Sequence, residues 1–163
     1  ETPRGPEAQP RRGPIPQAPP ESMADLARAL ADSALPLAKG KGISLTVDAK
    51  ADAGSAPLDA RRAYVALVDA LELALVLIGE ERRCVLRVRR QAEARRATLT
   101  LALTDSLRPS ERVTAHMIEG RFGEARAAAE AHGGGFDTAP DDEPEILWRF
   151  WVPLAYSART VIT

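Results

Sequence analysis

The sequence predicts an α+β fold, a two-layer α/β sandwich in which helices cover one face of a mixed sheet. Segments with apolar residues at helical spacing alternate along the chain with short segments in which apolar and polar residues alternate. Each element therefore has one apolar face to bury, and an open sheet covered on one face by helices buries all of them. The predicted order is helix, strand, helix, two strands, helix, two strands.

The N-terminal residues 1–21 contain seven prolines and almost no large apolar side chains. Such a segment cannot bury enough surface to offset its ordering entropy, so we predict a Pro-rich flexible linker there. The folded domain is predicted over residues 22–157, followed by a C-terminal tail at 158–163. Because the chain starts with Glu1 and not with Met, we expect a fragment of a longer protein.

The first predicted helix begins at Ser22, a plausible cap, and Pro36 is expected to kink it or to end its regular part. A strand, "ISLTVDA", follows. The central buried helix is predicted from about Asp59 to Gly79, because it is apolar around most of its circumference. Two strands come next, "CVLRVRR" and "ATLTLALT".

The C-terminal third begins with a polar, proline-containing loop from Asp105 to about residue 112. A less regular stretch to Glu119 leads to a helix over about 122–131. The final strand is "EILWRFWVPL", in which Trp148 is predicted to lie in the core and Trp151 on the opposite face.

Composition excludes several classes of function. The formal charge of −1, with no basic stripe interleaved with aromatic residues, argues against a nucleic-acid partner. The longest apolar run, "LALVLI" at 73–78, is too short to span a bilayer, so we expect no membrane contact by this chain. A single cysteine, Cys84, indicates a reducing, cytoplasmic compartment and is predicted to be a small core residue.

The segment "AAAEAHGGGF" raises the question of whether His132 takes part in a reaction or only stabilises the fold. It precedes three glycines at the end of a predicted helix, where glycine adopts the left-handed cap conformation. We therefore interpret His132 as a helix stop and a packing residue. His116 has no acidic neighbour of the kind seen in phospho-accepting histidines and is also interpreted as structural.

Several segments together resemble the catalytic and ATP-binding domain of sensor histidine kinases, in the GHKL ATPase superfamily. The end of the chain carries "AHGGGF" and a last strand ending in "VPLA", as in that family. The segment "PLDARRAYVALVDALELAL" is similar to the helix with the family's asparagine box, and "LTLALTDS" is similar to the strand before its adenine-binding aspartate. The resemblance covers residues 22–155 in the right order and implies a Bergerat-type ATP-binding fold.

The resemblance implies roles for acidic residues. Asp105 matches the aspartate that accepts a hydrogen bond from adenine, and we expect a buried carboxylate there; the alternative is a turn-forming Asp. Asp69 matches a residue that orients the attacking group. Leu73 stands where the magnesium-binding asparagine is expected, and leucine offers no oxygen ligand. Glu72 is a possible substitute, but it lies about 100° around the helix, and it is alternatively only the polar edge of a buried helix.

The resemblance also implies a phosphate site at the start of the last helix. Gly120, Arg121 and Gly123 match the end of the family's flexible lid, although the two glycines are spaced one residue too widely. The alternative is that these glycines serve only a turn. The family's glycine turn after the aspartate is replaced by "SLRP", and the lid is short.

The function implied is that of a divergent kinase domain binding ATP and Mg²⁺. It would transfer phosphate to a histidine on an upstream dimerisation domain, for onward transfer to a response regulator. The alternative is a degenerate pseudo-ATPase that acts as a protein-binding or phosphotransfer scaffold without nucleotide, which Leu73, "SLRP" and the short lid favour. A serine-directed, anti-sigma-factor-like kinase is a third reading, which the kinase-like first segment disfavours.

Overall fold

The computed structural model describes residues 22–49 and 58–154. The predicted linker at 1–21, the tail at 158–163 and the last residues assigned to the domain lie outside this part. The helices are α1 (Met23–Gly40), α2 (Ala60–Ile78), α3 (Pro109–Met117) and α4 (Gly123–Ala131), with a short 3₁₀ helix, η2 (Glu119–Phe122), before α4. The strands are β1 (Ser44–Asp48), β2 (Arg83–Gln91), β3 (Arg96–Leu103), β4 (Gly135–Thr138) and β5 (Ile146–Pro153).

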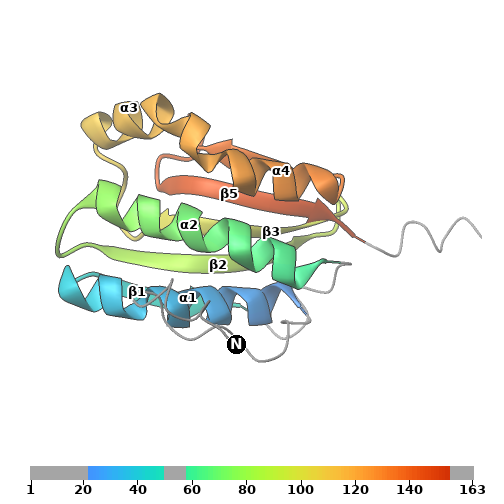
Figure 1. Cartoon of the computed structure of the whole chain (residues 1–163). Helices are drawn as coiled ribbons and strands as arrows, with labels where there is room; N and C mark the ends of the chain where they lie inside the picture. The colour runs from blue at the N-terminus through green and yellow to red at the C-terminus, as the bar shows by residue number, and fades with distance from the viewer. Residues whose placement is uncertain (1–21, 50–57, 155–163) are drawn as a thin grey trace, which may run out of the picture.

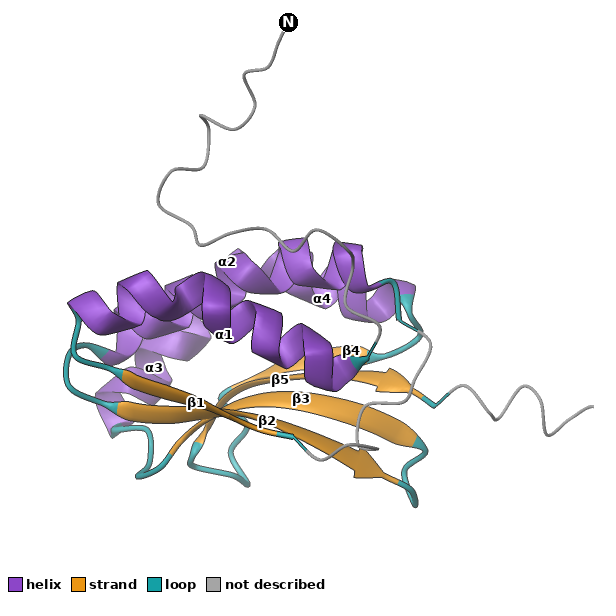
Figure 2. Cartoon of the chain, turned by 90° about the horizontal axis from the view of Figure 1, so that it is seen from below, coloured by secondary structure: helices purple, strands orange, loops and turns teal. Residues whose placement is uncertain are grey.

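The strands form one sheet in the order β1-β2-β3-β5-β4. The β1–β2 pair is parallel and the other pairs are antiparallel, so the sheet is mixed. Helices α1, α2 and α4 form a layer on one face of the sheet (Figures 1 and 2). The predicted two-layer α+β sandwich is confirmed.

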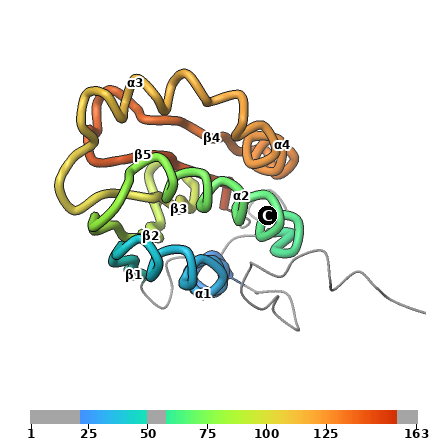
Figure 3. The backbone as a smooth tube through the Cα atoms, turned by 60° about the vertical axis from the view of Figure 1, so that its left-hand side comes forward, coloured from blue at the N-terminus to red at the C-terminus, as the bar shows by residue number. Residues whose placement is uncertain are grey.

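Helix α2 lies between α1 and α4 and packs against both (Figures 1 and 3). This central place explains why it is apolar around most of its circumference. The core between helices and sheet is built from fully buried large side chains: Trp148, Phe122, Phe150, Met23, Leu26, Leu30, Leu67, Leu71, Leu75, Leu86, Leu99 and Leu101. Trp148 and Cys84 are both in the core, as predicted.

Helix α1 begins at the predicted cap, since Ser22 Oγ accepts a hydrogen bond from the Asp25 N–H at 3.1 Å. The helix does not end at Pro36 but continues to Gly40. Pro36 is on the exposed side of α1. Water can therefore hydrogen-bond the Asp32 carbonyl that the proline leaves without a helical donor, which lowers the cost of a proline there.

The three glycines after α4 each have a separate structural reason. Gly133 has a φ of +82°, and the N–H groups of Gly133 and Gly134 donate to Glu130 and Ala129 carbonyls, which is a Schellman cap. A Cβ on Gly134 would lie 1.8 Å from the Trp151 carbonyl oxygen, and one on Gly135 would lie 2.9 Å from the Trp151 indole. Glycine is therefore required for the close approach of this turn to β5.

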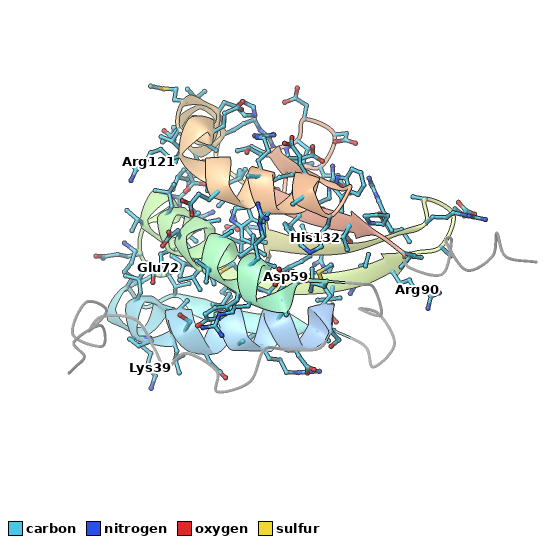
Figure 4. All side chains as sticks on the ribbon, turned by 45° about the vertical axis from the view of Figure 1, so that its right-hand side comes forward. Lys39, Asp59, Glu72, Arg90, Arg121 and His132 are labelled. Carbon is cyan, nitrogen blue, oxygen red and sulfur yellow. The ribbon has the colours of Figure 1, made fainter. Side chains whose placement is uncertain are left out.

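His132 is structural, as predicted. Its Nδ1 donates to the Ala128 carbonyl at 2.7 Å, and its Nε2 accepts a hydrogen bond from the Asp59 N–H at 2.8 Å. The ring therefore ties the end of α4 to the start of α2, and the two side chains lie side by side in Figure 4. Both contacts together require the neutral Nδ1–H tautomer.

The prediction of a loop and an irregular stretch between Asp105 and Glu119 holds only up to Arg108 and is wrong from Pro109 onward. Helix α3 occupies Pro109–Met117 and is followed directly by η2. Within residues 22–49 and 58–154, no helix is both long and apolar enough to cross a bilayer.

Candidate functional site

The two acidic residues predicted to be catalytic lie on α2. Asp69 is exposed and Glu72 is half-buried. The two residues are three positions apart, so their side chains lie on the same side of the helix. Leu73, at the position where the resemblance predicts a magnesium ligand, is partly buried and packs against the core. Figure 4 places Glu72 toward the end of the helical layer where α3 sits.

Asp105 follows the end of β3, as predicted, but its carboxylate is not buried. Its side chain is 66% exposed, and Oδ1 accepts a 3.4 Å hydrogen bond from the guanidinium of Arg82. The expected buried adenine acceptor is therefore replaced by an exposed carboxylate that already has a cationic partner. The strand ends at Leu103, and Thr104 and Asp105 are exposed residues beyond it.

Arg82 is the central side chain of this region. Only 4% of its side chain is exposed, and it follows α2 immediately before β2. Its Nη1 donates to the Ile78 carbonyl at 3.2 Å and to the carboxylate of Glu111, while Nη2 donates to the Ser106 carbonyl at 3.3 Å as well as to Asp105. One guanidinium thus joins the end of α2, the segment after β3 and helix α3.

Burial alone lowers the pKa of Arg82. The hydrogen bond and charge of Glu111 and those of Asp105 outweigh burial and raise the pKa above its ordinary value. The guanidinium is therefore charged at every accessible pH. Its charge also acts on the neighbouring thiol: burial raises the pKa of Cys84 to about 11, and Arg82 partly opposes that rise.

The two carboxylate oxygens of Glu111 accept hydrogen bonds from different residues. Its Oε1 accepts the Arg108 N–H at 2.8 Å, which caps the first turn of α3, while Oε2 pairs with Arg82. Pro109 occupies the first helical position of α3. Pro at this position with Glu two residues later is a local start signal that the sequence does contain.

A second set of contacts holds α3 against the β4–β5 connection. Arg112 Nη1 donates to the carbonyls of Ala139 and Pro140, both at 2.9 Å. His116 Nε2 lies 3.0 Å from the Ala139 carbonyl, as a donor to it. His116 is therefore engaged structurally. Helix α3 is anchored on two sides in the segment where the resemblance predicts a flexible lid.

The predicted phosphate site is formed differently from the expectation. Gly120 and Arg121 lie in η2, and Gly123 is the first residue of α4. The N–H of Arg121 donates to the Ile118 carbonyl, and the N–H of Gly123 donates to the Gly120 carbonyl. These two amides are used by the turn itself. The Arg121 side chain is exposed and lies near the junction of α3 and α4 (Figure 4).

These side chains fit a magnesium nucleotide poorly. The part of the chain that the structure describes holds no group of three or more His, Cys, Asp or Glu side chains that could bind a metal ion. Magnesium requires oxygen ligands, and Leu73 supplies none. Glu124 in the first turn of α4 places a carboxylate where a phosphate would otherwise find the positive end of the helix dipole.

Two hollows on the described surface lie away from the predicted site residues. One, of about 530 Å³, is a groove between the first half of α2 and α4, with Ala66, Ala127 and Ala128 in its lining. The other, of about 410 Å³, lies between the α3–α4 segment and β4–β5. None of the six residues predicted to be catalytic or nucleotide-binding lines either hollow.

The fold has close counterparts among solved structures. The catalytic domain of the histidine kinase ThkA superimposes with a TM-score of 0.62 at 15% identity, covering 79% of this chain and 92% of that one. A histidine kinase from Burkholderia phymatum gives 0.63 at 17% identity, covering 88% and 71%. The mycobacterial sensor histidine kinase MprB gives 0.56 at 15% identity, covering 81% and 94%.

The chain has the fold of a sensor histidine kinase catalytic domain. No protein-family model matches the sequence, and no curated protein matches it by sequence. The fold is therefore shared without a match to a family model or to a curated sequence, and Arg82, Glu111 and Leu73 lie in the region that the resemblance assigns to the nucleotide.

Proposed function

We propose that this kinase-type domain acts as a protein-binding or phosphotransfer scaffold in histidine-based signalling, without using Mg-ATP. The observation that carries the proposal is the buried Arg82–Glu111 pair, which fixes α3 in the segment expected to form a nucleotide lid. Leu73 in place of a magnesium ligand supports the same conclusion. Such a domain would work in the cytoplasm, beside an upstream dimerisation domain that carries the phospho-accepting histidine.

A protein partner is consistent with the behaviour of a structural neighbour. ThkA is known in complex with the response regulator protein TrrA. We propose that the present domain likewise contributes protein contacts to an assembly that includes a response regulator. These contacts would not depend on bound nucleotide. Helix α3 is already anchored to α2 and to the β4–β5 connection without it.

The second candidate is ATP-dependent phosphoryl transfer to a histidine on the upstream dimerisation domain. It is favoured by the exposure of Asp105, whose carboxylate Arg82 contacts only through Oδ1. An adenine amino group could still donate to such a carboxylate. In this case Asp69 and Glu72 would serve the reaction, and Gly120, Arg121 and Gly123 would lie by the phosphates. ShkA, another structural neighbour, is known in complex with AMPPNP.

Isothermal titration of the purified chain with ATP and ADP, with and without Mg²⁺, separates the two candidates. The scaffold proposal predicts no saturable binding at millimolar nucleotide. Magnesium-dependent binding that is lost in Asp105→Ala would overturn it in favour of the kinase. Binding of ADP that needs no magnesium but is lost in Asp105→Ala would also overturn the nucleotide-free proposal, because it would show a working adenine pocket.

A further inference from the structure

The face of the sheet opposite the helices carries a regular array of arginine, threonine and tryptophan. No described helix crosses this outer face (Figure 2). The register places Thr100 between Arg87 on β2 and Arg149 on β5. In the next row Thr98 lies between Arg89 and Trp151. Because side chains opposite one another in a sheet share a face, these residues form one continuous surface.

The two threonines of this face are buried between their larger cross-strand neighbours. Thr98 and Thr100 are only 2% and 5% exposed, although they are on the face that the described helices leave open. Long arginine stems cover apolar and small neighbours while keeping the charged head in water. The guanidinium groups of this face are therefore held close to the sheet, and a partner would not have to order fully mobile side chains.

Trp151 is held rigidly on the same face. Gly135, opposite it on β4, leaves room for the indole, since a Cβ at Gly135 would lie 2.9 Å from the ring. The guanidinium of Arg96 lies 4.8 Å from the ring centroid, and Arg96 Nε donates to Gln91 Oε1 at 2.7 Å. A half-exposed tryptophan under a fixed arginine has the composition of an interaction hot spot.

The neighbouring β2–β3 hairpin has an excess of positive charge. Residues 87–96 contain five arginines and one glutamate, whereas the whole chain has a formal charge of −1. Asp48 pairs with Arg89 at 2.9 Å and lies 3.9 Å from Arg87, so one carboxylate serves two guanidinium groups. Arg87 Nε is buried and has no hydrogen-bond partner. The hairpin therefore has more guanidinium groups than nearby carboxylates that could pair with them.

We infer that the outer face around the β2–β3 hairpin and Trp151 binds an acidic polypeptide segment, with carboxylates at Arg87 and Arg96 and an apolar side chain on Trp151. This inference rests on the proposed scaffold function and adds the chemical class of one partner. Asp48 and Asp137 lie on the same face and interrupt its positive charge, so the side-chain carboxylates of a polypeptide, which can turn toward separate arginines, fit it better than the continuous phosphate backbone of a nucleic acid.

The test is fluorescence anisotropy of the full chain with a labelled oligoglutamate peptide that contains one leucine. We expect saturable binding that weakens about tenfold or more in the double variant Arg87→Gln/Arg96→Gln, because both groups face the peptide. Arg90→Gln is the matched control: it removes one charge from the same hairpin at an exposed position that points to the other side of β2 (Figure 4). Its dissociation constant should change by less than about threefold, from long-range charge alone.

Three outcomes would overturn the inference. They are no saturable peptide binding, equal weakening by Arg90→Gln and by the double variant, and tighter binding of oligothymidylate than of the peptide. Circular dichroism of each variant verifies that the fold is kept. Nucleotide titration on the same sample tests the scaffold function separately, so ATP binding would contradict that function and leave the peptide result standing.

Discussion

The guanidinium of Arg82 donates to the carboxylate of Glu111 across a separation of 29 residues, and both side chains are buried. The pair connects the segment after α2 to the first turn of α3. A buried charge needs a partner of opposite charge, and neutralising Glu111 would leave Arg82 with only the largely exposed carboxylate of Asp105. This relationship explains why α3 is a fixed helix.

The first prediction concerns the free energy of unfolding. Glu111→Gln keeps an oxygen for the Arg108 N–H but removes the charge that pairs with Arg82. Because breaking a buried ion pair leaves one charge unpaired, the change should cost about 3 kcal/mol. Asp105→Asn is the matched control, and it should cost at most about 1 kcal/mol because its carboxylate is largely exposed. Urea denaturation measures both, and equal, small losses would refute the role given to the buried pair.

The second prediction concerns the turn after α4. Gly134→Ala should destabilise the fold by about 3 kcal/mol or more, because the new Cβ meets the carbonyl of Trp151 and the backbone must move. Gly40→Ala, at the end of α1, meets no atom within 4 Å and should change stability by less than about 1 kcal/mol. Thermal unfolding of the two variants is the measurement. Similar melting temperatures would show that the turn is not as tightly packed as described.

The third prediction concerns alkaline pH. Burial raises the pKa of Cys84 to about 11 from an ordinary value near 9, and Arg82 only partly opposes this. The pKa of the thiol is higher in the folded state than in the unfolded state. The contribution of the neutral, buried thiol to the free energy of unfolding is therefore complete below about pH 9 and is lost as the pH rises to about 11. The loss should approach about 3 kcal/mol once the thiol is fully ionised in both states. Unfolding experiments at several pH values, compared with Cys84→Ala, isolate the thiol, and identical pH dependence in both proteins would contradict the prediction.

Much of the fold could be predicted from the sequence because its signals are local. The alternation in β3 and β5, the cap at Ser22 and the glycine stop after His132 all act over a few residues. Helix α3 was not predicted because only Glu111 and Ala115 of it are buried, so it has no apolar stripe. Its Pro-x-Glu start signal was present, but in a segment that otherwise has the composition of a loop.

The site was harder to predict because it depends on long-range pairing. Arg82 lies in the charged run "GEERR", where nothing local distinguishes a buried arginine from an exposed one. Its burial follows from where Glu111 and the carbonyls of Ile78 and Ser106 meet in the fold. The positions of Asp69, Glu72 and Leu73 on α2 followed from helix spacing, while their roles in nucleotide binding stay predictions.

Hydrogen exchange of the α3 backbone amides, measured with and without Mg-ATP, tests the central claim most directly. If the Arg82–Glu111 pair fixes α3 as a structural helix, amides from Val113 to Met117 should be protected in the free protein and unchanged by nucleotide. Fast exchange in the free protein that slows when Mg-ATP is added would contradict the account, because it would show a mobile lid that nucleotide orders.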